Sequence, residues 1–159
     1  MTDQLVDSWM INHRINLYLL DAIPPDALSA VPVGMKGRSV AEIFAHLHKV
    51  RGMWLEPAAP DLAVGLPKLP TKTKADKDAL TKDVLRAALT QSGERMGQLF
   101  LRGVEQGKLP NIKPHVAGFL GYLIAHEGYH RGEIGMTLTL AGHPLPDEIA
   151  YGLWDWEKR

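Results

Sequence analysis

Cysteine is absent from the 159 residues of this chain. Its absence excludes disulfides, thiolate nucleophiles and zinc–thiolate sites, so a tight metal site would have to use His, Asp or Glu side chains. An excess of one charge is also missing, because 18 Lys and Arg balance 18 Asp and Glu. Without a broad positive field the chain is a poor partner for nucleic acid, and we expect none.

Long hydrophobic runs are missing as well. Polar residues interrupt each apolar stretch well before the ~20 residues needed to cross a bilayer. The first ten residues lack the basic and then apolar pattern of a signal peptide. We therefore expect no membrane association and a cytoplasmic location. Because 45% of the residues are hydrophobic, residues 1–159 are predicted to form a single domain with one core.

Alternating β-branched residues, which would predict strands, are also absent, whereas apolar residues recur at helical spacing in four segments. The helices are expected at about residues 2–21, 39–54, 81–103 and 114–140. Ser39 and Glu42 have the spacing of a capping box at the start of the second helix. The fold class is thus predicted to be all-α, a four-helix bundle. A short extra helix is expected in the C-terminal tail, with Trp154 or Trp156 packed on the bundle.

The connection between the second and third helices is long, from Glu56 to about Lys77, and contains four of the 11 prolines. Helix-to-helix links in simple bundles are shorter, so this length favours a crossover or a lid, and chain order need not be neighbour order. Four lysines lie between residues 68 and 78. Because Asp76 and Asp78 offset much of their charge, we interpret this run as a solvated loop rather than an anion site.

His126 and His130 are the most informative of the seven histidines. With Phe119, Leu123 and Ile134 they recur at intervals of three or four, which places both rings in the apolar stripe of the fourth helix. Buried imidazoles need partners, because an unbonded ring costs about 1–3 kcal/mol. A shared metal ion would satisfy both, and separate hydrogen bonds inside the bundle are the alternative.

The same segment fits the H-E-x-x-H pattern of zinc proteases. The extended metzincin pattern fails, because Glu133 and Met136 stand where it requires glycine and histidine. No strand is predicted to bind a peptide, so a zinc protease is the less favoured alternative. Glu127 is the candidate catalytic residue, a general base beside a metal-bound water, and its other interpretation is a solvated flank residue.

Three segments together resemble the DinB-like family of four-helix-bundle metalloenzymes. The strongest is AHEGYHRGEIGMTLTLAG (125–142), which resembles the last bundle helix with its H-x-x-x-H-R-G-[QE] signature. SVAEIFAHLHKVRGMWL (39–55) is similar to the second helix, and WMINHRINLYLLDAIPPDAL (9–28) to the opening helix. The resemblance implies a metal held by three imidazoles.

Carried over by position, the resemblance assigns the paired ligands to His126 and His130 and the single ligand of the second helix to His46. His48 is the alternative ligand, because helical periodicity alone does not separate it from His46. Asn12 resembles an Asn of the family's opening helix and could reach the site.

Glu133 shares the face of the paired histidines. It could orient a ligand ring from behind, or form a salt bridge with an Arg of the first helix such as Arg14.

The expected function is that of a metal-dependent hydrolase or transferase, with open metal positions for water, a thiol or a substrate oxygen. Imidazole ligands favour Zn or Ni over Mg and Ca. By analogy with relatives, the small-molecule substrates could include a low-molecular-weight thiol, and the protein could be a homodimer. The alternative is a non-catalytic metal-binding stress-response bundle that the metal stabilises.

Overall fold

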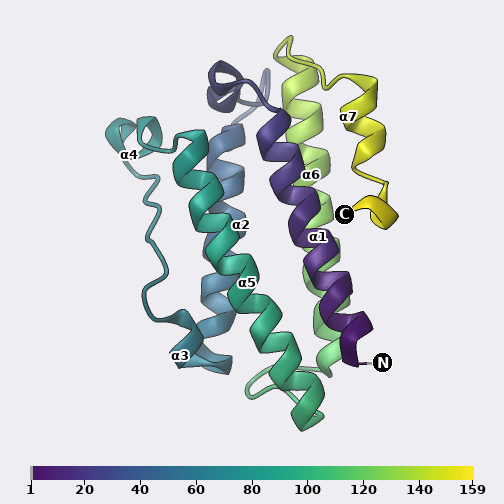
Figure 1. Cartoon of the computed structure of the whole chain (residues 1–159). Helices are drawn as coiled ribbons and strands as arrows, with labels where there is room; N and C mark the ends of the chain where they lie inside the picture. Colours follow the sequence, from purple (N-terminus) through teal and green to yellow (C-terminus); the bar gives the residue numbers. More distant parts are fainter. Residues whose placement is uncertain (1) are drawn as a thin grey trace.

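The computed structural model describes residues 2–159 as an assembly of helices (Figure 1). The four long helices are α1 (Thr2–Ala22), α2 (Val40–Ala58), α5 (Lys82–Gln106) and α6 (Val116–Leu140). The short ones are η1 (Pro25–Ser29), α3 (Pro60–Ala63), α4 (Lys74–Asp78), α7 (Asp147–Gly152) and η2 (Trp156–Lys158). Residues 2–159 contain no strand, which confirms the all-α prediction. None of these helices combines the length and apolar character that a membrane span needs.

The long helices form a bundle in which chain order differs from neighbour order. Helices α1 and α6 run in one direction and α2 and α5 in the other (Figure 1). Both α1 and α2 pack against α5 and against α6. Although α1 and α2 are consecutive long helices in the sequence, they make few contacts with each other. The segment between α2 and α5 returns from one end of the bundle to the other. The predicted crossover is confirmed.

The crossover begins later than predicted and contains more helix. Helix α2 continues to Ala58, with Pro57 inside its last turn, and α3 follows with Pro60 in its first turn. Proline is tolerated in the first turn of α3 because the N–H groups there have no partner within the helix in any case. Asn111 of the α5–α6 loop donates to the Pro57 carbonyl at 2.8 Å. Helix α4 lies within the lysine-rich run that we predicted to be a loop.

Side-chain caps fix where the long helices begin. The predicted capping box is present: the Ser39 hydroxyl accepts from the Glu42 N–H at 3.2 Å, and the Glu42 carboxylate accepts from the Ser39 N–H at 2.9 Å. The Thr81 hydroxyl accepts from the Val84 N–H at 3.3 Å and so caps α5. Helix α6 begins at Val116 rather than at Pro114, because the His115 ring accepts from the Gly118 N–H at 3.0 Å and so acts as its cap.

The C-terminal tail forms the expected short helix, α7, but Trp154 does not pack on the bundle. Its side chain is exposed and Trp156 is only half-buried. The terminal residue makes the contact instead. The Arg159 guanidinium lies 3.7 Å from the centre of the Tyr18 ring, and its backbone oxygen accepts from Arg14 at 2.8 Å. A cation–π contact thus takes the place that we expected for a tryptophan.

The apolar core is divided into two clusters at opposite ends of the bundle. One cluster contains Leu19, Phe44 and Ile134, near η1, and the other contains Trp9, Phe100 and Leu123, near α3. Between these clusters lies a middle section of the bundle, where each of the four long helices contributes polar side chains. These residues form the polar layer: Asn12, His13, Asn16, Arg51, Ser92, Glu127 and Arg131.

An ion pair between Arg51 of α2 and Glu127 of α6 lies at the centre of the polar layer. Their side chains are 0% and 1% exposed and the pair is bidentate, with N–O distances of 2.7 and 3.0 Å. Asn12 and Asn16 of α1 also donate to Glu127, at 2.7 and 2.6 Å. Both asparagines in turn accept from Arg131, at 2.8 and 2.9 Å. Burial alone would raise the pKa of Glu127, but the Arg51 charge and these donors hold it below its usual value.

The polar layer also fixes α5. Arg51 donates to the Leu89 carbonyl of α5 at 3.0 Å, and Trp9 of α1 donates to the Gly93 carbonyl at 2.8 Å. The His13 ring packs directly against Gly93, where a larger residue would place its Cβ on the ring atoms. Burial and the Arg51 charge lower the pKa of His13 to about 3, so this ring stays neutral. Every long helix is therefore bonded to another within the polar layer.

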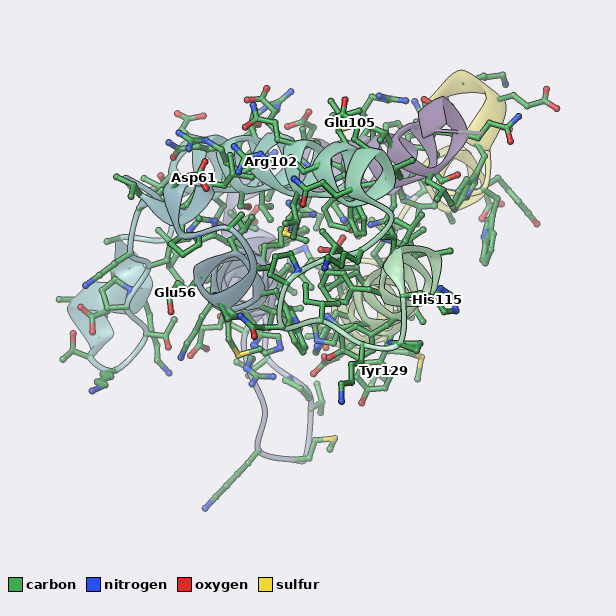
Figure 2. The ribbon with its side chains drawn as sticks, turned by 90° about the horizontal axis from the view of Figure 1, so that it is seen from below. Glu56, Asp61, Arg102, Glu105, His115 and Tyr129 are labelled. Carbon is green, nitrogen blue, oxygen red and sulfur yellow. The ribbon has the colours of Figure 1, made fainter. Side chains whose placement is uncertain are left out.

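We predict that Arg51→Ala destabilises the protein by about 3–5 kcal/mol, because it leaves the Glu127 carboxylate buried and unpaired. The measurement is urea unfolding followed by circular dichroism, on metal-free protein. Arg102→Ala is the matched control, because Arg102 makes an equally short bidentate pair with Asp61 at the surface, at 2.9 and 2.7 Å (Figure 2). Water solvates both partners there, so Arg102→Ala should lower the free energy of unfolding far less than Arg51→Ala. Equal losses in the two variants would contradict the assigned role of the polar layer.

Candidate metal centre

His126 and His130 are one turn apart on α6, and His46 of α2 lies opposite them. The ring centres of His126 and His130 are 4.6 Å apart. The His46 ring centre is 4.8 Å from that of His130 and 5.5 Å from that of His126. Each ring offers one nitrogen such that the three nitrogens lie within 4.8 Å of one another. Two segments 80 residues apart, at His46 and His126, therefore converge on one point.

Three imidazoles at these separations fit a transition-metal ion. Nitrogens bound to one ion at about 2.0–2.1 Å in a tetrahedral arrangement lie about 3.4 Å apart, so small side-chain rotations suffice to close the group. The buried Nδ1 of His126 has no hydrogen-bond partner within residues 2–159, so the site leaves a ring nitrogen unsatisfied. A neutral imidazole is also the donor that Zn, Ni, Cu and Fe accept.

Glu133 contacts His130 from behind. Its Oε2 lies 2.7 Å from the His130 Nδ1, three residues away on the same helix. An Nδ1–H donated to this carboxylate leaves the Nε2 lone pair free, and such contacts orient metal-ligating rings. The proposed alternative partner of Glu133, Arg14, is engaged elsewhere, with Asp7 at 3.6 Å and with the chain terminus. Glu133 therefore contacts His130 and not Arg14.

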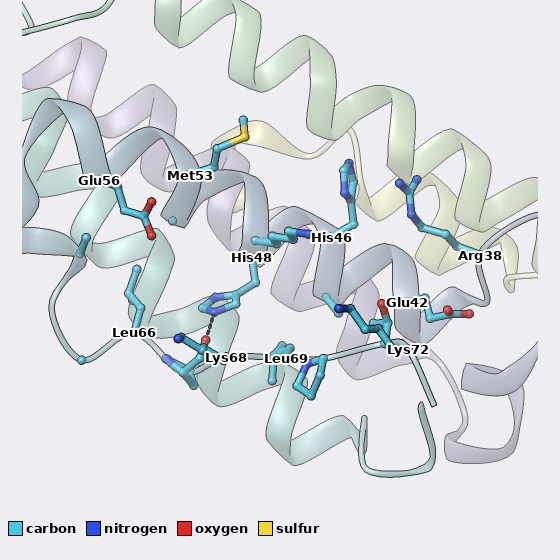
Figure 3. A pocket seen from close by; sticks show the side chains of 18 residues that line it. Arg38, Glu42, His46, His48, Met53, Glu56, Leu66, Lys68, Leu69 and Lys72 are labelled. Atoms are coloured by element: carbon cyan, nitrogen blue, oxygen red, sulfur yellow. Dashed lines mark hydrogen bonds between the residues drawn. The ribbon is translucent and has the colours of Figure 1, made fainter. Parts of the chain in front are cut away.

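His48 turns away from this group. Its Nε2 lies 2.7 Å from the carbonyl oxygen of Pro67 in the crossover, on the other side of α2 from the α6 histidines (Figure 3). Two residues along a helix are separated by about 200° around its axis, which is why His46 and His48 point to different neighbours. The contact of His48 is with the crossover backbone.

Two of the three rings, His46 and His126, are held neutral. Burial, the Arg38 charge and the neighbouring rings lower the pKa of His46 to about 4. Burial and the His130 ring likewise lower the pKa of His126. Neutral imidazole is the form that binds metal, so protons compete weakly for these two ligands near neutral pH.

Aromatic side chains enclose the outer side of the α6 histidines. The Tyr122 ring is stacked on that of His126, with centres 6.2 Å apart, and the Tyr129 ring meets that of His130 edge-on at 5.2 Å. These contacts restrict rotation of both imidazoles. The site is thus bordered by α2 on one side and by two tyrosines of α6 on the other.

Glu127 does not lie on a solvated flank, which was one of its two expected positions. It is buried, and both of its oxygens accept bonds from Arg51, Asn12 or Asn16. Asn12, expected near the metal, instead connects Glu127 to Arg131. Neither residue has a hydrogen bond to a histidine of the group.

The sequence model of the DinB family matches residues 1–158. The chain belongs to the DinB family. No curated protein and no solved structure is similar enough to this chain to count as a match. Family membership and the His46, His126 and His130 group agree with the expectation of a metal-binding DinB bundle. Neither fixes a reaction or a metal.

Sequence reasoning missed the partners that the DinB bundle supplies to Glu127. Arg51 stands four residues after Leu47 and four before Leu55, which are both core residues, so it occupies a core position of the α2 stripe. A charged residue there needs a buried counter-charge. This was the available signal, and it could have directed attention to Glu127 as that counter-charge.

We predict that the DinB protein purified without an affinity tag contains about one metal ion per chain, and that His46→Ala or His126→Ala removes it. Each substitution deletes one of three ligands, and a two-ligand site holds an ion much more weakly. His48→Ala is the matched control on the same helix and should retain the metal, because His48 contacts Pro67 instead. Elemental analysis measures the content, with circular dichroism to check folding. Metal lost through His48 alone would overturn this assignment.

Proposed function

We propose that this DinB protein is a metal-dependent hydrolase or transferase whose single divalent ion is held by His46, His126 and His130. The observation that carries the proposal is the convergence of three ring nitrogens within 4.8 Å. Three protein ligands are the number found in catalytic zinc sites, which keep a position open for water or substrate. His46 also lines a cavity, so a small molecule has access to the site from that side.

Each residue of the site has a distinct proposed task. His46 and His126 supply neutral nitrogens, and Glu133 holds the proton of the His130 Nδ1 so that the other nitrogen faces the ion. Tyr122 and Tyr129 restrict the α6 rings. A divalent ion held there would lower the pKa of a coordinated water or thiol and so supply a nucleophile near neutral pH.

Zinc or nickel is the proposed metal, because three imidazoles without a carboxylate or thiolate ligand favour borderline cations over Mg or Ca. The proposed substrate is a small molecule. Because the chain has no cysteine, a thiol reaction would need a low-molecular-weight thiol as cosubstrate. Water is the alternative nucleophile, and would make the same site a hydrolase.

Glu127 is proposed to position α6 rather than to act as a general base. A base beside the metal must be free to accept a proton, whereas both Glu127 oxygens accept from Arg51 and from asparagines, and its pKa is lowered. The H-E-x-x-H match therefore lacks its catalytic glutamate. Residues 2–159 also contain no strand to bind a peptide, so a zinc protease is not favoured.

A non-catalytic metal-binding bundle is the second candidate. Its supporting observation is that the three histidines lie between α2 and α6, so an ion would join two helices that are distant in sequence. Binding only to the folded state would then stabilise the protein in proportion to metal concentration. Such a protein would bind metal without turnover.

The test is transfer from a panel of cellular thiols to 1-chloro-2,4-dinitrobenzene, together with hydrolysis of a nitrophenyl ester, in metal-loaded and chelated protein. We expect turnover above background that falls at least tenfold after chelation and in His46→Ala, but not in His48→Ala. Activity unchanged by complete chelation would refute the metal-dependent mechanism. Full metal loading without turnover would favour the non-catalytic candidate.

We also propose a homodimer, and the exposed side of α6 is the surface that fits it. From Tyr122 to Leu140 the exposed positions of α6 carry no charge, and Tyr129 and Met136 are 71% and 65% exposed. An uncharged, apolar helix face matches a second copy of itself without like-charge repulsion, and the chain has no net charge to oppose self-association.

For this dimer we predict that Met136→Glu yields a monomer, because facing carboxylates would be buried close together. Met35→Glu is the control, since Met35 is just as exposed but lies in the η1–α2 loop, and it should leave the dimer intact. Light scattering after size-exclusion chromatography measures both masses. A monomeric wild-type protein at high concentration would rule this surface out as a dimer interface.

A further inference from the structure

A cavity of about 750 Å³ lies between α2 and the crossover segment 63–72. One wall is the exposed side of α2, and the other is the extended chain from Gly65 to Lys72 (Figure 3). His46 lines the cavity, so the space adjoins the candidate metal centre. Its volume falls in the range of about 300–1,000 Å³ that is typical of small-molecule sites.

Positive charge prevails along this cavity. Arg38, Lys49, Lys68 and Lys72 line it, and within residues 2–159 none of them takes part in an ion pair. Two carboxylates, Glu42 and Glu56, also line it. Glu42 is already engaged, with Lys77 at 3.0 Å and with the Ser39 N–H. Four cations therefore face one uncommitted carboxylate.

The aspartates that we expected to offset the lysine run are directed elsewhere. Asp76 caps α4, where it accepts from the N–H groups of Lys72 and Thr73 at 3.1 and 2.8 Å. Asp78 pairs with Lys74 on the same short helix. Neither aspartate lines the cavity, so the charge balance of the segment does not hold at the cavity wall.

Apolar side chains separate the charged groups. Leu66, Leu69 and two prolines line the cavity from the crossover (Figure 3), and Met53 of α2 is a further apolar lining residue. The His48–Pro67 hydrogen bond holds the crossover against α2 at this level. A ligand with an apolar body and an anionic group would match such a wall better than a purely ionic one.

Two of the lining residues point away from the crossover. Arg38 and His46 both extend toward α6, the helix that carries the other two rings (Figure 3). The His46 end of the cavity is therefore the end nearest to the candidate metal centre.

We infer that this cavity binds a small amphipathic anion, with its apolar body along Leu66 and Leu69 and its anionic group near Lys68 and Lys72 of the crossover wall. As the identification of a substrate this inference rests on the proposed function, because the bound molecule would reach the metal centre at His46. As a statement about binding it stands on the cavity alone.

The test uses the fluorescent anion 8-anilinonaphthalene-1-sulfonate and its neutral analogue N-phenyl-1-naphthylamine, titrated into the full chain with and without metal. We expect the double variant Lys68→Gln/Lys72→Gln to weaken binding of the anion about three- to tenfold, as the loss of partly solvated charge contacts implies. Binding of the neutral analogue should not change. The matched control, Lys108→Gln/Lys113→Gln, removes two exposed lysines of the α5–α6 loop, and the anion should bind it as it binds the wild type.

Displacement of the bound dye by octanoate, octyl phosphate and octanol then distinguishes the head group. Stronger displacement by either acid than by octanol supports the anion site, and the stronger acid identifies a carboxylate or a phosphate ligand. Three results would overturn the inference: equal weakening of both dyes, equal weakening in the control variant, or displacement by octanol as strong as by the acids.

The outcome is separable from that of the proposed function, because dye binding is read without turnover. Charge-dependent binding in a metal-loaded protein without activity would leave the cavity site standing and remove the enzyme proposal. Activity in a protein whose dye binding does not depend on Lys68 and Lys72 would do the reverse.

Discussion

The buried ion pair between Arg51 and Glu127 is the interaction on which the arrangement of this bundle depends. Two apolar clusters could pack with several rotations of α6, because apolar contacts are not directional. A bidentate pair at 2.7 and 3.0 Å permits only one. Since Asn12 and Asn16 bond to the same carboxylate, α1, α2 and α6 are fixed at a common level. Such a pair contributes specificity more than net stability, because desolvation offsets much of its attraction.

The same rotation of α6 creates the candidate metal site. Glu127 and Arg131 directly follow His126 and His130 in sequence. When Glu127 and Arg131 face the polar layer, the two histidines therefore face His46 of α2. His46 stands five residues before Arg51, more than one helical turn away, and reaches the α6 rings at the neighbouring level. The polar layer therefore positions both sets of ligands without contacting the metal position itself.

The site combines rigid and accessible parts. His130 is held by Glu133 within one helix, and the tyrosines of α6 restrict the paired rings. On the α2 side, His46 opens on a cavity whose other wall is a proline-rich crossover without long helices. A crossover of this length connects α2 with the parallel α5, and it also supplies one wall of the cavity that His46 lines. The same crossover thus sets the order of the helices and forms a wall of the cavity beside His46.

Local sequence signals were sufficient where local physics decides. The capping box at Ser39, the helical periodicity and the proline-rich link follow from interactions within a few residues, and the structure confirms them with shifts at helix ends. The start of α6 differs from the prediction because His115, and not the residue before Pro114, acts as its cap. The pairing of His126 with His130 was also readable, because residues four apart share a helix face.

The sequence by itself determined an all-α chain with two imidazoles on one face of its last long helix, because helical periodicity is encoded residue by residue. It did not separate His46 from His48 by periodicity, and it misjudged the surroundings of Glu127. Only the tertiary structure decided these, since each depends on a partner from another element: α6 for His46, Pro67 for His48 and Arg51 for Glu127. Contacts between distant segments follow from how the helices pack, which no short stretch of sequence specifies.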